Sequence, residues 1–184
     1  MSGLLRFSSS IDGLNTLIGK LVSWLILMAV LVSSINAIIR KVFDQSSNAW
    51  LELQWYLFGA VFMLGAAWTL LRREHIRIDI LFNTFPRRVR LWIELLGHIL
   101  FLMPFVMLMV YESTDFVIRS IQLQEMSFNA GGLIVWPAKA LVLVGFFLLF
   151  LQGISEIIKQ VAVIRGILPE PETGSSHGQN SHES

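Results

Sequence analysis

Three ionisable side chains within apolar stretches are the residues of this chain best placed to do chemistry. They are Glu52, Glu94 and His98. A carboxylate at membrane depth could couple a solute to an ion, and a histidine could hold a haem iron. Both carboxylates lie too near the ends of their stretches to fit that role well. A haem with two axial histidines needs a second one facing His98, so a hydrogen bond between helices is the expected role of His98.

Other kinds of site are excluded by composition. The chain has no cysteine, which removes disulfides, thiolate metal sites and thiol nucleophiles. His177 and His182 lie in a polar terminal stretch that offers too few ligands for a metal. The formal net charge of +1 creates no field that would favour nucleic acid. We therefore expect no catalytic residue, no metal, no cofactor and no nucleic-acid partner.

The elements that carry these residues are long and apolar. Of the 184 residues, 54% are hydrophobic and 15% are charged, against about 25% charged in soluble domains. Four continuously apolar stretches each reach the roughly 20 residues with which a helix crosses a bilayer: 17–39, 51–71, 91–111 and 133–157. Alternation typical of membrane strands is missing. The first stretch is longer than a signal-peptide core and has no clear cleavage site, so we expect it to be retained.

Basic residues predict the orientation of these spans, because cytoplasmic loops carry the excess of Lys and Arg. With a cytoplasmic N-terminus, ten basic residues flank the inner side: Arg6, Lys20, Arg72, Arg73, Arg77, Arg87, Arg88, Arg90, Lys159 and Arg165. Four flank the outer side: Arg40, Lys41, Arg119 and Lys139. Both termini are therefore expected in the cytoplasm.

Shorter segments beside the spans are predicted to lie at the membrane surface. Apolar residues recur at three- and four-residue steps near the N-terminus: Leu4, Phe7, Ile11, Leu14 and Ile18. This piece either lies flat as an amphipathic helix or extends the first span. Asp79 could cap a short helix over 79–85 before Pro86, and 112–132 could hold another short helix. Residues 1–168 would form the membrane domain, and the polar segment 169–184 a disordered tail.

One extended pattern carries a family resemblance. It runs Glu52-Leu53, then apolar residues with Gly59-Ala60 and Gly65-Ala66-Ala67, then Arg72-Arg73-Glu74, His75-Ile76-Arg77-Ile78-Asp79 and Pro86-Arg87-Arg88-Val89-Arg90. With this pattern the chain resembles the small membrane subunit of tripartite ATP-independent periplasmic (TRAP) transporters, the DctQ-like small permease family, over about 17–166. It departs from the commonest form at Trp55, where many relatives carry a basic residue.

A second pattern is similar to a subgroup of that family. Glu125, Ser127, Gly131-Gly132-Leu133 and Trp136-Pro137-x-Lys139 resemble members linked to 2-oxo acids, lactate and mannitol-like or chloroaromatic compounds. The resemblance implies a non-catalytic subunit of the bacterial inner membrane. It would brace a large multi-span subunit that holds the substrate and sodium sites and moves as an elevator, while a periplasmic solute-binding protein delivers the solute.

The residues expected to meet the partner subunit or anionic lipids are Glu52, Arg72, Arg73, His75, Arg77, Asp79, Arg87, Arg88, Arg90, Trp136 and Lys139. Two other functions stay open. The chain could be a stand-alone four-helix carrier coupled to an ion, or a haem- or quinone-linked membrane anchor. The scarcity of ionisable residues deep in the spans favours the scaffold over both.

Overall fold

The computed structural model describes residues 2–44, 47–72 and 85–169, and these residues are almost entirely helical. The elements are α1 (Ser2–Phe43), α2 (Asn48–Arg72), α4 (Arg87–Gly97), the π-helical turn η1 (His98–Leu102), α5 (Met103–Gln122) and α6 (Trp136–Ile164). Four helices are long and apolar enough to cross a membrane, with α4, η1 and α5 together forming one of them over Arg88–Gln122. The prediction of four helical spans is confirmed.

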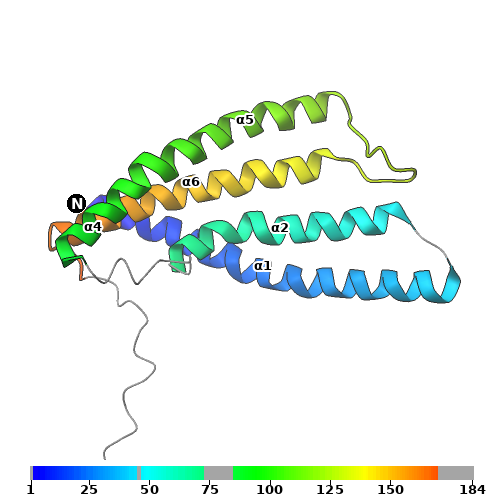
Figure 1. Ribbon diagram of the computed structural model, residues 1–184, viewed down its shortest axis with the longest axis horizontal. Helices are drawn as coiled ribbons and strands as arrows, with labels where there is room; N and C mark the ends of the chain where they lie inside the picture. Colours follow the sequence, from blue (N-terminus) through cyan, green and yellow to red (C-terminus); the bar gives the residue numbers. More distant parts are fainter. Residues whose placement is uncertain (1, 45–46, 73–84, 170–184) are drawn as a thin grey trace, which may run out of the picture.

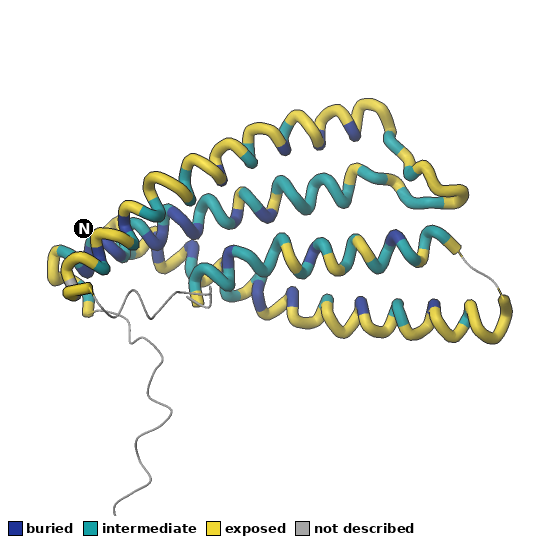
Figure 2. Tube along the Cα trace, viewed as in Figure 1, coloured by how far each residue is buried: buried dark blue, intermediate teal, exposed yellow. Residues whose placement is uncertain are grey.

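The helices form a flat row instead of a closed bundle. Figure 1, viewed down the shortest axis, shows the order α5, α6, α2 and α1. The N-terminal part of α1 reaches across to α6, so α6 packs against α1, α2, α4 and α5. Buried positions follow the lines where helices meet, while most other positions are exposed (Figure 2). Large apolar side chains such as Trp24, Trp55 and Phe62 are exposed, which is stable only in an apolar solvent such as lipid.

The first helix is continuous from its start. The structure therefore has the predicted N-terminal piece as an extension of the first span, the second of the two alternatives. Its buried residues recur at helical spacing and face α6 and α2: Ser8, Ile11, Asn15, Gly19 and Val22. Of the predicted apolar stripe, Ile11 is buried whereas Leu4, Phe7 and Leu14 are exposed. Small and polar residues, together with Ile11 and Val22, thus pack against the rest of the protein, while most of the large apolar residues point outward.

The third span is longer than predicted. Helix α5 continues to Gln122, so the prediction of a short separate helix within 112–132 is wrong. The polar residues that indicated an end of the span are satisfied inside the helix. The hydroxyl of Ser113 donates to the carbonyl of Met109 over 2.5 Å, and the hydroxyl of Thr114 to that of Val110 over 2.7 Å.

A proline explains the π-helical turn in this span. Pro104 has no N–H and its ring crowds the preceding turn, so the α-helical pattern cannot continue through it. In η1 the N–H of Met103 donates to the carbonyl of His98, five residues back, which is the π-helical bond. The helix type therefore changes locally just before Pro104.

Close contact between α2 and α6 depends on Gly145. A Cβ atom built at this position would lie 2.7 Å from the carbonyl oxygen and 2.8 Å from the Cβ of Met63. Only glycine lets the two backbones approach this closely, as small residues do between membrane helices. Of the remaining predicted elements, the helix over 79–85 lies outside the described residues apart from Phe85, as does all of the tail after Pro169.

Candidate functional site

Polar side chains gather along the second half of α6 and around the loop that precedes this helix, which packs against most of the others. Residues 140–151 contain no polar side chain. The first group, here called the α1–α6 cluster, consists of Asp12, Asn15, Gln152, Ser155, Glu156 and Lys159. The second, here called the Glu52 clamp, consists of Glu52, Ser127, Asn129 and Leu133.

Gln152 is the centre of the α1–α6 cluster and is fully buried. Its Oε1 accepts a hydrogen bond from Asn15 Nδ2 over 2.7 Å. Its Nε2 donates to Asp12 Oδ1 and to Glu156 Oε1, both over 3.0 Å. Asp12 also accepts from the Ser155 hydroxyl over 2.7 Å. The amide therefore links three polar side chains on two helices.

Lys159 balances the two carboxylates of the cluster. Its Nζ lies 3.0 Å from Asp12 Oδ2 and 2.5 Å from Glu156 Oε1. An ammonium group between two acids offsets part of the cost of removing them from water. Among the described residues, no group of three or more His, Cys, Asp or Glu side chains could hold a metal ion. The geometry therefore fits a structural role, in which hydrogen bonds and ion pairs hold α1 against α6.

The same end of α6 also contacts α4. Buried Gln160 donates from Nε2 to the carbonyl of Leu91 over 3.2 Å and to Glu94 Oε2 over 3.0 Å. Gln160 therefore ties α4 to the end of α6 that holds the cluster. Glu94 thus contributes to helix packing near the end of its span.

Sequence reasoning missed the α1–α6 cluster, although a signal was present. Gln152, Ser155, Glu156 and Lys159 are spaced by three, one and three residues, which places them on one face of a helix. Such a polar face at the end of an apolar helix indicates a polar partner. Asp12 lies between the apolar residues near the N-terminus, and spacing alone does not reveal that its partners are on α6.

At the opposite end, Glu52 holds the loop between α5 and α6. The side chain is only 5% exposed although it lies one turn into α2. Its Oε1 accepts hydrogen bonds from Ser127 Oγ and, over 2.8 Å, from Asn129 Nδ2. Its Oε2 accepts from the backbone N–H of Leu133 over 2.6 Å. Three donors from one loop therefore converge on a single carboxylate.

The two glycines of the second sequence pattern are explained by this contact. Gly131 has a φ of +71°, a conformation that other residues rarely adopt. A Cβ at Gly132 would lie 2.5 Å from that of Ser127 and 2.8 Å from Glu52 Oε1. Both positions thus need glycine for the loop to close over Glu52.

An ion pair between Lys139 and Glu125 joins the start of α6 to the loop that precedes it. Lys139 Nζ lies 2.5 Å from Glu125 Oε2 and 3.9 Å from the centre of the Phe116 ring. The Ser120 hydroxyl donates to the same carboxylate over 2.7 Å. The hydrogen bonds from Lys139 and then Ser120 lower the pKa of Glu125 below its ordinary value, since both stabilise the ionised form. Glu125 therefore stays charged and paired at neutral pH.

The predicted interface residues fall at both ends of the row of helices. Glu52 and Lys139 are engaged within the chain, and Trp136 is partly exposed at the start of α6. Arg72 and Arg88, at the opposite end, are exposed.

Of the other basic residues in this set, Arg87 and Arg90 belong to α4, at the same end of the row as Arg72. The rest lie outside the described residues. Arg72 lies 5.4 Å from the centre of the Trp68 ring, within reach of a cation–π contact. The Nε atom of Arg90 is buried without a hydrogen-bond partner in the described part of the chain. Arg87 begins α4. Outside the described residues lie Arg73, His75, Arg77 and Asp79. The interface and lipid roles of the whole set stay predictions.

Within the described part of the chain, His98 makes a hydrogen bond inside its own helix and not the one that was expected between helices. Its Nδ1 lies 2.7 Å from the carbonyl oxygen of Glu94, one turn earlier in the same helix. That carbonyl also accepts from the backbone N–H of His98. The prediction was wrong because a ring nitrogen can reach the carbonyl four residues back, which apolar spacing does not reveal.

A comparison with protein-family models gives one match. The model described as "Tripartite ATP-independent periplasmic transporters, DctQ component" matches residues 13–163. No curated protein matches the chain. The matched region begins directly after Asp12 and ends in the last turn of α6, so it includes the Glu52 clamp and all of the α1–α6 cluster except Asp12. The chain belongs to the DctQ family, the small membrane component of TRAP transporters.

Proposed function

We propose that this protein is the scaffold subunit of a sodium-driven TRAP system that takes up an organic acid or a similar small solute. The DctQ family works with a large membrane subunit and a periplasmic binding protein, and it is a family of non-catalytic transport subunits. In this assignment the chain braces the large subunit in the bacterial inner membrane. The family match over residues 13–163 is the observation that carries the proposal.

The arrangement of the helices supports a bracing role. The row of helices exposes many large apolar side chains, which offers a wide lateral surface to a membrane partner (Figures 1 and 2). The α1–α6 cluster and the Glu52 clamp hold the row at its two ends. A row of helices joined in this way can stay in place in the membrane while an attached subunit moves.

The apolar stretch 140–151 of α6 argues against a stand-alone carrier. A solute or ion that crosses the membrane needs polar groups at intermediate depth. Between Lys139 and Gln152 the central helix carries only apolar residues and one glycine. The nearby Glu52, Asp12 and Glu156 carboxylates are hydrogen-bonded to neighbouring side chains at the two ends. They therefore serve the packing of helices and a loop.

Co-purification and reconstitution test the proposed function. We expect the tagged chain to retain the large subunit encoded with it in detergent, and sodium-driven uptake in vesicles to need both subunits and the binding protein. The control is the chain reconstituted alone, which should move no solute. Ion-coupled uptake by the chain alone would establish the carrier instead, and haem absorption in the purified chain would establish the anchor.

Both termini are proposed to face the cytoplasm. Exposed Arg72 and Arg88 and the end of α6 lie at the same end of the row as the N-terminus. Alkaline phosphatase, which is active only outside the cytoplasm, should be inactive when fused after Arg165. The same enzyme fused after Phe43 is the matched control and should be active. Activity in the first fusion and none in the second would reverse the orientation.

A further inference from the structure

The loop between α5 and α6 holds an aromatic side chain in a fixed, fully exposed position. Phe128 stands between Ser127 and Asn129, and the side chains of both neighbours bind Glu52. With its two flanking residues turned toward Glu52, the ring points away from the protein. Leu123 and Met126 of the same loop are also exposed. Such an apolar group on a loop would be costly if it faced only water.

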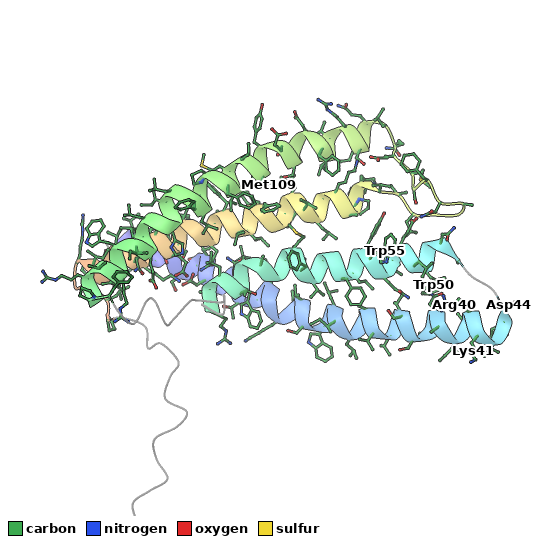
Figure 3. The ribbon with its side chains drawn as sticks, in the orientation of Figure 1. Arg40, Lys41, Asp44, Trp50, Trp55 and Met109 are labelled. Carbon is green, nitrogen blue, oxygen red and sulfur yellow. The ribbon has the colours of Figure 1, made fainter. Side chains whose placement is uncertain are left out.

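The depth of this loop is set by its contact with α2. Glu52 lies between Trp50 and Trp55, and such aromatic residues mark the interface between lipid and water. Figure 3 shows both tryptophans at the end of α2 beside the C-terminal end of α1. In Figure 1 the loop runs back beside this end of α2 and does not extend past the end of α1. The loop extends beyond α5 and α6 but not beyond the end of α1, so it lies at interface depth.

Several polar backbone groups of the loop are paired within the chain, which lowers the cost of a position at the lipid surface. The N–H of Ser127 donates to the carbonyl of Leu133, and that of Val135 to the carbonyl of Glu125, each over 3.0 Å. The N–H of Gly132 donates to the carbonyl of Asn129 over 3.0 Å. The Tyr56 hydroxyl donates to the carbonyl of Ile134 over 3.1 Å. Hydrogen bonds within the loop and to Tyr56 thus satisfy part of its backbone while the apolar side chains stay outside.

We propose that residues 123–134 form a membrane-interface anchor, in which Phe128, with Leu123 and Met126, inserts into the interfacial layer of the lipid bilayer. Glu52 positions the anchor by binding both neighbours of Phe128. The inference rests on the chain spanning a membrane, as in the proposed function. A soluble partner is less well suited to this surface, because the loop does not extend beyond the end of α1.

The absence of cysteine makes the test direct. Phe128→Cys, Phe62→Cys and Lys41→Cys variants of the full chain each carry one nitroxide label in phosphatidylcholine–phosphatidylglycerol nanodiscs. Phe62 is an exposed residue within α2 and reports the hydrocarbon, whereas Lys41 near the end of α1 reports water. We expect the label at 128 to collide more with oxygen than with a water-soluble nickel complex, at a depth between the two references.

Three results would count against the proposal in different ways. Nickel accessibility at 128 equal to that at 41 would overturn it. Protection at 128 that arises only when the solute-binding protein is added would make the patch a protein-docking site. A label at 62 that is accessible to nickel would instead refute the membrane placement, and with it the proposed function.

The role of Glu52 as the positioning residue is tested in the same assay. Adding Glu52→Ala to Phe128→Cys removes the acceptor for three donors, so nickel accessibility at 128 should rise toward the value at 41. Glu112→Ala is the control, because Glu112 is an exposed carboxylate in the middle of α5 and is not part of the Glu52 clamp. An unchanged label depth in the Glu52→Ala variant would show that the clamp does not hold the anchor.

Discussion

A single methyl group at position 145 should separate α2 from α6. We expect Gly145→Ala to lower the free energy of unfolding by about 1–3 kcal/mol, as overpacking typically does. The new Cβ would meet the backbone of Met63, with the carbonyl oxygen 2.7 Å and the carbonyl carbon 3.0 Å away. Backbone atoms in a helix cannot rotate aside, so the two helices must move apart.

Gly153→Ala is the matched control, on the same helix. There the added Cβ would meet the Sδ of Met103 at 2.9 Å and a Leu102 methyl at 3.5 Å, both at the ends of flexible side chains. These can shift, so the loss of stability should be much smaller than for Gly145→Ala. Reversible unfolding in mixed detergent micelles, followed by circular dichroism, measures both. Equal stability of the two variants would contradict the close contact between α2 and α6.

The spans could be predicted because they depend on apolar length alone. The second was expected over 51–71 and begins and ends within a few residues of these limits, at Asn48–Arg72. The third extends well past its predicted end, because polar residues after Tyr111 remain in α5 and bind its own backbone. Hydropathy detects how long a chain stays apolar, but it cannot detect polar groups satisfied inside a helix.

Only part of the candidate site could be predicted from the sequence, for a similar reason. Glu52 and Lys139 were singled out from patterns in the sequence, together with the glycines at 131 and 132. Which partner each would bind could not be predicted, because Glu52 and Ser127 are 75 positions apart. The α1–α6 cluster was missed altogether. Asp12 and Gln152 come from opposite ends of the chain, and only the packing of α1 across α6 brings them together.

Removing the central amide of that cluster should destabilise the protein strongly. We expect Gln152→Leu to cost about 2 kcal/mol, within the range for leaving a buried polar partner unpaired. Asn15 would lose the acceptor of its Nδ2, and its Oδ1 already has no hydrogen-bond partner among the described residues. Asp12 and Glu156 would each lose one donor but keep Lys159. The main penalty therefore falls on the Asn15 amide, which is only 1% exposed.

The double variant Asn15→Leu with Gln152→Leu separates this penalty from simple loss of packing. Replacing both partners by apolar side chains removes the unpaired amide, so the double variant should be more stable than Gln152→Leu alone. The same unfolding assay gives the coupling energy, which should be favourable and about 1 kcal/mol or more for residues in direct contact. Additive losses would show that Asn15 and Gln152 do not depend on each other. In that case the hydrogen bond between them would not hold α1 against α6. The ion pair between Lys159 and Asp12 would do so instead.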